Sequence, residues 1–284
     1  MALPSASLLA QSILSGIFIG ALYGLLGLGL SLSWGLLRQI SLAHFALAFL
    51  AAYLCYQLSH VMDPLATLVI IVPLFALIGV AIQWVFARFR VSPFNSLLVT
   101  FGLTVIVEAI IQGIWTADFR KLESSYGAAK FKIGALYVPV PELMTLVAAL
   151  ALAFGVHAVL RHTDLGRALR ATAEDGPIAA AFGMNQKALA LGLAGLCAAF
   201  AGIAGVCIAL SYTLAPSQIY AWIGVVFATV MLGGLGGAIG PLVAGFVIGV
   251  SESVTMAVIS PAWAPLVSFS LLILVLLLKP GSSR

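Results

Sequence analysis

The stretch RHTDLGRALRATAEDGPIAAAFGMNQK, Arg161–Lys187, is the most polar segment in the second half of a very apolar chain. It holds seven charged residues, in a protein that has only 13 basic and 9 acidic residues. No charged residue follows it until Glu252. Because long apolar segments lie on both sides of it, the stretch predicts a loop that leaves a membrane and returns to it.

The composition places the rest of the chain in lipid. Hydrophobic residues make up 63% and charged residues 8% of the sequence, and the mean hydropathy is +1.18. A soluble domain carries about 25% charged residues, which it needs to cover its surface. Since one crossing uses about 20 residues, eight to ten helices would occupy almost all 284 residues. We therefore expect one all-α polytopic membrane domain over residues 1–284, without a soluble catalytic domain.

Apolar runs separated by polar or turn residues predict eight or nine transmembrane or partly spanning helices. The first run lacks the basic start of a secretory signal peptide, since no charged residue precedes Arg38, and we interpret it as a permanent span. Two of the runs, 43–58 and 241–256, are short enough to be tilted, broken or only partly spanning. The predicted ranges are 7–30, 43–58, 65–87, 94–115, 141–160, 188–210, 219–233, 241–256 and 263–278.

The distribution of basic residues predicts the orientation, because cytoplasmic loops carry the excess of Lys and Arg. With nine spans, the loops on one side hold Arg38, Arg88, Arg90, Arg161, Arg167, Arg170, Lys187, Lys279 and Arg284. The loops on the other side hold only Arg120, Lys121, Lys130 and Lys132. The first side is therefore cytoplasmic, with the N-terminus outside and the C-terminus inside. The external loop 116–140 is either a solvated connector or a surface for an extracytoplasmic partner.

Small residues recur at helical spacing, which predicts closely packed helices in lipid. Gly16, Gly20 and Gly24 form one such row, Gly245 and Gly249 a second, and Ala198/Gly202 with Ala201/Gly205 two offset pairs. The run 233–241 (GGLGGAIGP) is different, because so many glycines cannot hold a regular helix cheaply. It is either a tight cytoplasmic turn or a helix break that lines a pathway. Cys55, Cys197 and Cys207 lie in apolar runs and are odd in number, so they are expected to be packing residues rather than a disulfide framework.

The polar stretch 161–187, hereafter the coupling segment, contains the signals of two short helices. Gly166–Ala173 extends the fifth span, and Glu174-Asp175-Gly176-Pro177 interrupts it. Asp175 is a good N-cap, Pro177 suits a first helical turn, and Gly183 suits a left-handed stop. These signals predict a separate short helix from about Pro177 to Phe182, with small residues on its surface.

This segment resembles the cytoplasmic loop of ABC-importer permeases of the branched-chain amino-acid (LivH/LivM-type) family. The matched positions are Gly166, Arg167, Ala168, Arg170, Ala171, Ala173, Glu174, Asp175, Ala179 and Gly183. Similar matches follow in the family's order at 20–25 (GALYGL), 40–44 (ISLAH), 233–241 and 279–281 (KPG). The resemblance therefore covers most of the chain. It implies that Arg167, Arg170, Glu174, Asp175, Gly176, Pro177, Ala180 and Gly183 couple the protein to an ATPase.

The resemblance also implies partners. The chain has no phosphate-binding lysine motif, so ATP and Mg²⁺ would bind to two separate cytoplasmic ATPase subunits, and no cofactor is expected on this chain. A second permease chain, related (LivM-like) or identical, and an extracytoplasmic solute-binding protein would complete the transporter. Neither a metal nor a nucleic acid is expected. His44-Phe45-Ala46 departs from the family's usual polar sequence, so the solute stays open among branched-chain amino acids and other small organic compounds.

A few polar residues inside the predicted spans are candidates for the translocation path. Glu108 has Gln112 one turn on and Thr104 one turn back, and a carboxylate in lipid is costly unless it has a role or partners. His44 could line a cavity, cap a helix or satisfy a hydrogen bond in the core. Glu252 is expected to reach water at an outer helix end. The candidates for the path are Ser41, His44, Glu108, Gln112, Gly234 and Gly236.

Two other classes of function compete with the permease. An ion-coupled secondary transporter of a small organic solute would use intramembrane carboxylates, and Glu108 with Glu252 could supply them. Such a transporter has no partner to dock on the coupling segment, however. An intramembrane serine protease would need a serine–histidine pair, for which Ser251 and His44 are only nominal candidates, since no GxSxG motif is present. We therefore predict a permease and no enzyme.

Overall fold

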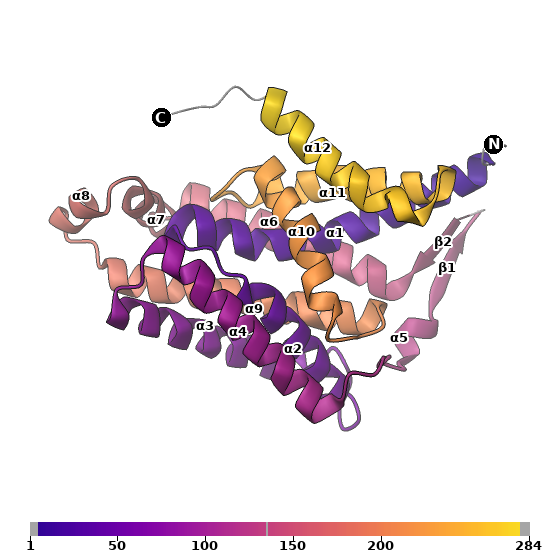
Figure 1. The fold of residues 1–284 in the computed structure, drawn as a ribbon, viewed down its shortest axis with the longest axis horizontal. Helices are drawn as coiled ribbons and strands as arrows, with labels where there is room; N and C mark the ends of the chain where they lie inside the picture. Colours follow the sequence, from indigo (N-terminus) through magenta and orange to yellow (C-terminus); the bar gives the residue numbers. More distant parts are fainter. Residues whose placement is uncertain (1–4, 135, 279–284) are drawn as a thin grey trace.

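The computed structural model of the chain describes residues 5–134 and 136–278 and shows a helical bundle, with α8 at one end and the strands at the other (Figure 1). The first helices are α1 (Ala6–Leu37), α2 (Ala43–Leu58), α3 (Leu68–Phe89), α4 (Pro93–Trp115) and α5 (Ser125–Ala128). Two strands follow, β1 (Lys130–Ile133) and β2 (Leu136–Pro139). The remaining helices are α6 (Val140–His162), α7 (Asp164–Glu174), α8 (Gly176–Ala181), α9 (Gln186–Ser211), α10 (Gln218–Gly233), α11 (Ile239–Val258), a 3-10 turn (Pro261–Trp263) and α12 (Ala264–Leu278).

The helices confirm the predicted all-α polytopic membrane protein. Within the described residues, six helices are long and apolar enough to cross a membrane, namely α1, α3, α4, α6, α9 and α11. Three shorter apolar helices, α2, α10 and the segment 261–275, complete the set. Each of the nine predicted ranges overlaps one of these helices.

Two predicted helix lengths were wrong. The first range was expected to end at residue 30, but α1 continues to Leu37 and has 32 residues. Inside this extension Ser31 is tolerated because its single hydroxyl hydrogen is shared between the carbonyl oxygens of Gly234 and Gly237, both 3.1 Å away. At 1.5 Å per residue, α1 is about 48 Å long, so it must tilt or project beyond a hydrocarbon core of about 30 Å. Helix α11 has 20 residues and is not the short segment that we expected.

The two predicted glycine rows face each other and bring α1 and α11 into backbone contact. A Cβ atom added to Gly20 would lie 2.5 Å from the carbonyl oxygen of Gly245, and one added to Gly245 would lie 2.4 Å from that of Gly20. At Gly249 a Cβ would lie 2.4 Å from the carbonyl oxygen of Gly16. Real Cβ atoms do not approach backbone this closely, so the glycines are what allow the two helices to touch.

Helices α1 and α9 form the centre of the bundle, and α3, α4 and α6 lie at its periphery. In the most apolar 18 residues of α9, 83% are buried, compared with 22% in the same length of each of the three peripheral helices. Gly205 of α9 is part of this packing, since a Cβ there would lie 2.2 Å from the carbonyl oxygen of Ala48 in α2. Large apolar side chains cover the outside of the peripheral helices, as lipid contact requires, among them Val69, Leu77, Phe94, Ile106, Ile114 and Phe154.

The loop 116–140 contains regular structure that the sequence did not predict. Helix α5 is followed by the antiparallel pair β1–β2, in which Lys130 lies opposite Pro139. The amide of Gln11 in α1 clamps β2, because its Nε2 donates to the Tyr137 carbonyl at 3.0 Å and its Oε1 accepts from the Tyr137 N–H at 2.9 Å. The pair is too short to stand alone and depends on such contacts.

Glu252 does not reach water, contrary to our expectation. Its side chain is buried between α1, α11 and α12. The Tyr23 hydroxyl donates to its Oε2 at 2.8 Å, and the Ser268 hydroxyl donates to its Oε1. Two donors from distant parts of the chain thus supply the hydrogen bonds that water was expected to supply, which is how a carboxyl group is tolerated at membrane depth.

Candidate functional site

The coupling segment begins with a sharp turn between α6 and α7. Thr163 ends α6 and caps α7, and its Oγ1 accepts the Gly166 N–H at 3.2 Å. Gly166 lies so close to α6 that a Cβ would be 2.3 Å from the Leu160 carbonyl oxygen. Arg167 forms an ion pair with Asp164 on the exposed side of α7. These contacts make α7 a separate helix instead of a continuation of the fifth span.

Helix α8 has the caps and nearly the boundaries that the sequence predicts. Asp175 is its N-cap, and its Oδ1 accepts the Ile178 N–H at 3.1 Å. Pro177 lies in the first turn, and Gly183 ends the helix with φ +82°. The Gln186 side-chain amide donates to the Gly176 carbonyl, which ties the start of α8 to the start of α9. The short helix is therefore held at both ends.

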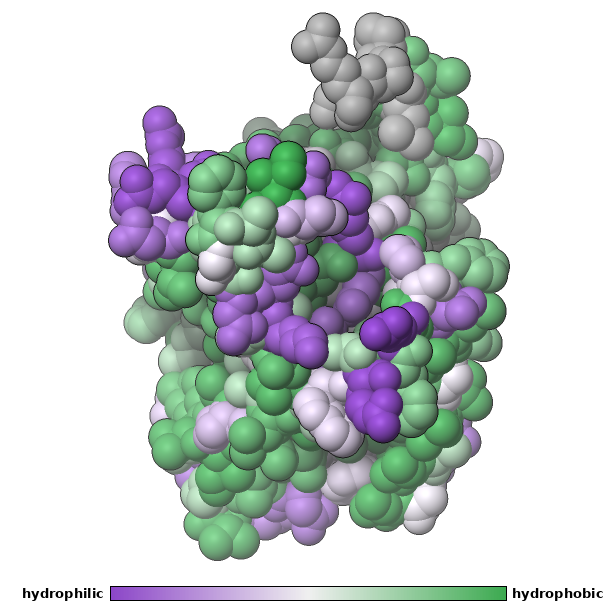
Figure 2. Space-filling model, turned by 90° about the vertical axis from the view of Figure 1, so that its left-hand side faces the viewer, coloured by the Kyte–Doolittle hydropathy of each residue, from purple (hydrophilic) through white to green (hydrophobic). Residues whose placement is uncertain are grey.

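The free face of α8 is apolar, which is unusual for an exposed polar segment. Ile178 is 57% and Phe182 81% exposed, and Ala180 is exposed between them, whereas Ala179 packs inward. Helix α8 lies at one end of the molecule, beyond the ends of the long helices (Figure 1). Figure 2 looks onto this end and shows many hydrophilic residues with smaller hydrophobic areas among them. An exposed apolar patch with a polar rim is typical of a protein–protein contact.

Loss of the N-cap is expected to loosen α8 without unfolding the protein. Replacing Asp175 with alanine removes the acceptor for the Ile178 N–H, and such a loss typically costs about 1 kcal/mol of helix stability. Hydrogen exchange of the amides in 176–182 should then accelerate about fivefold. Asp175→Asn is the matched control, because asparagine caps a helix equally well. Equal exchange rates in both variants would show that the cap does not hold α8.

Arg38 connects the coupling segment to the core of the bundle. It follows α1, and its guanidinium donates to the carbonyl oxygens of Ala173 at 2.7 Å and Glu174 at 3.4 Å, at the end of α7. Arg170 and the Glu174 side chain are exposed nearby. Sequence reasoning missed the role of Arg38, since nothing in the sequence relates it to a segment 135 residues away. A displacement of α7 and α8 would thus act directly on the end of the central helix α1.

Glu108 and Gln112 form a polar cluster on the outer flank of α4. The Gln112 side chain donates to Glu108 Oε1 at 3.1 Å, and the Tyr220 hydroxyl of α10 donates to Glu108 Oε2 at 2.5 Å. Seven residues separate Glu108 from the end of α4, which places it about 10 Å inside that end. The cluster is partly exposed, and its neighbours Ile106 and Ile114 are exposed and apolar. The sequence predicted the first two residues but not Tyr220.

Ser41 and His44 line a small internal cavity of about 40 Å³. His44 is buried at the start of α2, and its Nε2 has no hydrogen-bond partner among the described residues. The ring packs against Gly29 of α1, where a Cβ would lie 2.4 Å from its Cε1. The cavity includes neither Glu108 nor Ser251. Ser251 donates to the Val247 carbonyl of its own helix, so the nominal serine–histidine pair is not formed.

Gly234 and Gly236 belong to the turn between α10 and α11, so the glycine run interrupts the helices as predicted. Both have positive φ, +90° and +77°, a conformation in which glycine avoids strain. The Gly236 N–H donates to the Ser31 carbonyl at 3.0 Å, and a Cβ on Gly35 would lie 2.0 Å from that nitrogen. The turn is therefore packed on the last part of α1.

At the opposite end, the loop 116–140 forms a groove of about 500 Å³ beside β1 and the start of α6. Its polar lining includes Lys121, Glu123, Lys130 and Glu142. Tyr126, nearby on α5, donates to Asp63 at 3.0 Å, and this bond to a carboxylate raises the pKa of Tyr126 above its ordinary value. The predicted family ending at 279–281 and Arg284 lie outside the described residues.

The predicted site residues thus fall into separate places. The structure brings together the residues of the coupling segment at one end and Glu108 with Gln112 on one flank. It puts Ser41 and His44 in an inner cavity, and Gly234 and Gly236 in a turn. Cys55, Cys197 and Cys207 are buried and unpaired.

Comparison with known proteins identifies the family of the chain. The model of the family described as "Branched-chain amino acid transport system / permease component" matches residues 12–276. The high-affinity branched-chain amino acid transport system permease protein LivH of Salmonella typhimurium is 28% identical over 95% of this chain and 93% of its own. LivH of Escherichia coli K12 is 25% identical over the same shares, and BraD of Pseudomonas aeruginosa is 22% identical over 95% and 94%. No solved structure matches the chain.

The family match covers nearly the whole helical bundle, from the second turn of α1 to the last turn of α12. It also includes the coupling segment with its capped helix α8. The apolar helices and the separate polar segment are therefore both part of the region that the family model matches. The chain is a multi-pass membrane protein that belongs to the family of permease components of branched-chain amino acid transport systems.

Proposed function

We propose that this permease imports its solute with energy from ATP that is bound, with Mg²⁺, and hydrolysed by two separate cytoplasmic ATPase subunits. The observation that carries the proposal is helix α8, a short helix capped at both ends with Ile178 and Phe182 exposed at one end of the bundle. The ATPases would bind this apolar face. Arg167, Arg170, Glu174, Asp175, Gly176, Pro177, Ala180 and Gly183 would form or hold the contact.

The coupling would run from α8 to the bundle as a rigid-body motion. Closure of the ATPase pair would push α8 and α7, and the hydrogen bonds of Arg38 would transmit the push to the end of α1. Helix α1 touches α11 through backbone contacts, so neither helix can move far without the other. A two-state bundle biased by nucleotide would then open and close the path.

The proposed orientation places α7 and α8 in the cytoplasm, with the N-terminus outside and the C-terminus inside. It rests on the excess of basic residues in the loops on the α8 side. The groove beside β1 and α6 then faces outward. We propose that an extracytoplasmic solute-binding protein docks there and delivers the solute.

The solute is proposed to be a branched-chain amino acid or a related small apolar compound. LivH and BraD are named for branched-chain amino acid transport, and each is aligned with at least 95% of this chain. Few charged residues lie within the apolar helices of this chain. Such a lining suits a largely apolar solute better than a strongly charged one.

The path is proposed to run along the flank of α4 and α10, between this chain and a second permease, most simply a related LivM-like chain. Glu108 and Gln112 are partly exposed there at membrane depth, and a polar cluster is costly against lipid. A partner chain or a water-filled path would remove that cost. Ser41, His44, Gly234 and Gly236 would act from inside the bundle, around the last part of α1.

Replacing Glu108 with leucine is expected to lower solute uptake about tenfold while the subunits still assemble. The change leaves the Tyr220 hydroxyl and the Gln112 amide without their acceptor, at a cost of about 1–3 kcal/mol. Tyr220→Phe removes the same hydrogen bond from the other side and is the control for packing. Uptake by vesicles and the melting temperature are measured together. A fall in melting temperature with unchanged uptake per folded complex would remove Glu108 from the path.

Co-purification tests the proposed function as a whole. The tagged full chain is isolated in mild detergent and its associated proteins are identified, and uptake is measured after ATP depletion and after collapse of the ion gradients. We expect an ATPase to accompany the chain and uptake to stop on ATP depletion alone. Uptake that follows a proton or sodium gradient and ignores ATP depletion would instead establish the ion-coupled secondary transporter.

A further inference from the structure

The end of the bundle that carries α8 also contains a large cavity with a strongly basic lining. The cavity has a volume of about 610 Å³ and lies between the ends of α1 and α3, α7 and the start of α9. Its charged residues are Arg38, Arg88, Arg90 and Lys187, and no acidic side chain lines it. Hydrophilic residues surround a hollow in this view of the molecular surface (Figure 2). A cavity of this size can hold a small molecule or a headgroup.

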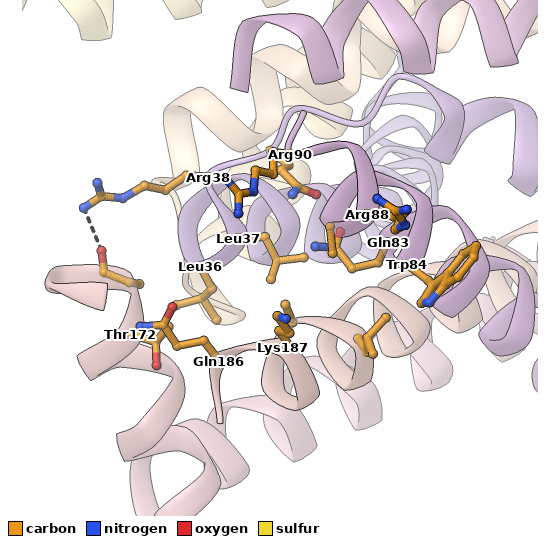
Figure 3. A pocket seen from close by; sticks show the side chains of 15 residues that line it. Leu36, Leu37, Arg38, Gln83, Trp84, Arg88, Arg90, Thr172, Gln186 and Lys187 are labelled. Atoms are coloured by element: carbon orange, nitrogen blue, oxygen red, sulfur yellow. Dashed lines mark hydrogen bonds between the residues drawn. The ribbon is translucent and has the colours of Figure 1, made fainter. Parts of the chain in front are cut away.

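Three of the four cations are free to bind a ligand. The Arg38 guanidinium is directed away from the cavity centre toward the Ala173 carbonyl, as the dashed bond in Figure 3 shows. Arg88 comes from the last turn of α3 and Arg90 directly follows that helix, and Lys187 comes from α9 on the facing side (Figure 3). Among the described residues, no ion pair involves Arg88, Arg90 or Lys187, and the ion pair that is formed joins Arg167 to Asp164 on α7. They therefore create a positive field without an internal counter-ion.

The α3 wall of this cavity is continuous with the lipid-facing surface. Trp84 lines the cavity and is 59% exposed, and Leu77, two turns earlier on the same side of α3, is 68% exposed. Arg88 follows Trp84 by one turn, in the last turn of the helix. Tryptophan beside a basic residue at the end of an apolar helix is typical of the membrane interface, at headgroup depth. The cavity thus opens where phospholipid headgroups lie.

We propose that this cavity binds the phosphate headgroup of an anionic phospholipid, with the acyl chains lying along the exposed face of α3. Arg88, Arg90 and Lys187 would contact the phosphate, since guanidinium and ammonium groups bind phosphate through charge-assisted hydrogen bonds. Basic pockets between helices on the cytoplasmic side of a membrane are suited to such headgroups. Trp84 would pack against the glycerol region.

The cavity is poorly suited to a zwitterionic amino acid. An amino acid carries an ammonium group, and the cavity lining offers no carboxylate to pair with it. The positive charge of the lining also repels this ammonium group. An anionic lipid brings only the negative charge that the cavity lacks. Its position beside α7 and α9 would also make the headgroup part of the support of the coupling segment.

Lipid binding to the purified full chain, with the subunits that accompany it, tests the proposal. Dioctanoyl-phosphatidylglycerol and dioctanoyl-phosphatidylcholine are titrated in detergent, and bound lipid is counted by native mass spectrometry. We expect the anionic lipid to bind at least about tenfold more tightly. The double variant Arg88→Gln/Lys187→Gln should weaken binding of the anionic lipid about 25-fold, because each basic residue near the surface contributes about a factor of five.

Matched variants separate a specific site from general attraction. Arg161→Gln removes a charge at the same end of the molecule but outside the cavity, and should change binding less than twofold. The separate double variant Arg88→Lys/Lys187→Arg keeps both charges and should bind the anionic lipid about as tightly as the unchanged protein. Equal losses in Arg161→Gln would overturn the site, as would inorganic phosphate that displaces the lipid at equal concentration. Lipid that binds the chain alone but is lost when the accompanying subunits are bound would assign the cavity to a protein contact instead.

Discussion

Replacing Gly20 with leucine is expected to destabilise this protein severely. A Cβ at position 20 would lie 2.5 Å from the Gly245 carbonyl oxygen and 2.8 Å from the Phe246 Cα, and both are backbone atoms that no rotamer change can move. The helices α1 and α11 would have to separate along their whole contact. Overpacking costs typically 1–3 kcal/mol, and more where backbone must shift, so we expect a loss of at least about 3 kcal/mol. This is a large part of the stability of a typical domain.

The measurement is the yield of monodisperse protein and its melting temperature in detergent. Gly102→Leu is the matched control, because Gly102 is also in the middle of an apolar helix but has no atom within 4 Å of the added Cβ. Gly245→Leu should reproduce the defect from the other helix. A Gly20→Leu protein with normal yield and melting temperature would mean that α1 and α11 do not pack as described.

Replacing Ile178 and Phe182 with aspartate is expected to abolish ATP-driven uptake by removing the proposed ATPase contact. Both side chains are exposed on α8, so neither supports the fold of this chain. If the ATPase buries them, each contributes about 1.5–3 kcal/mol, and their loss should weaken association roughly a thousandfold. The measurement is the amount of ATPase that co-purifies with the tagged chain, together with uptake and the melting temperature of the chain itself.

Val61→Asp provides the control for this experiment. Val61 is 86% exposed in the connection between α2 and α3, at the end of the molecule away from α8, and an aspartate there also replaces an exposed apolar side chain with a negative charge. It should leave ATPase association unchanged. If the double variant keeps its ATPase but loses uptake, α8 acts in coupling without being the main contact. If it keeps both, the proposed role of α8 is wrong.

The elements that were predictable from sequence are those that depend on neighbouring residues. The nine apolar ranges were visible because a crossing helix must be apolar over most of its length. Helix α8 was predicted to within about one residue, because Asp175, Pro177 and Gly183 act on backbone groups only two to four positions away. By contrast, the predicted end of the first span failed at Ser31, whose hydroxyl is satisfied by residues more than 200 positions later.

The choice of partners was decided by the tertiary structure alone. The row Gly16, Gly20 and Gly24 could have packed against the small residues of either of two later helices, α9 or α11, and only the assembled bundle selects α11. Lipid is as apolar as a leucine side chain, so no hydrophobic force ranks such pairings, and close fit between whole helices does. The sequence alone determined that helices cross a membrane and that a capped helix lies outside them, because both features depend on residues that are close in the chain. The tertiary structure decided that Glu252 is buried against Tyr23, that Glu108 meets Tyr220, and that Arg88 and Lys187 face one cavity.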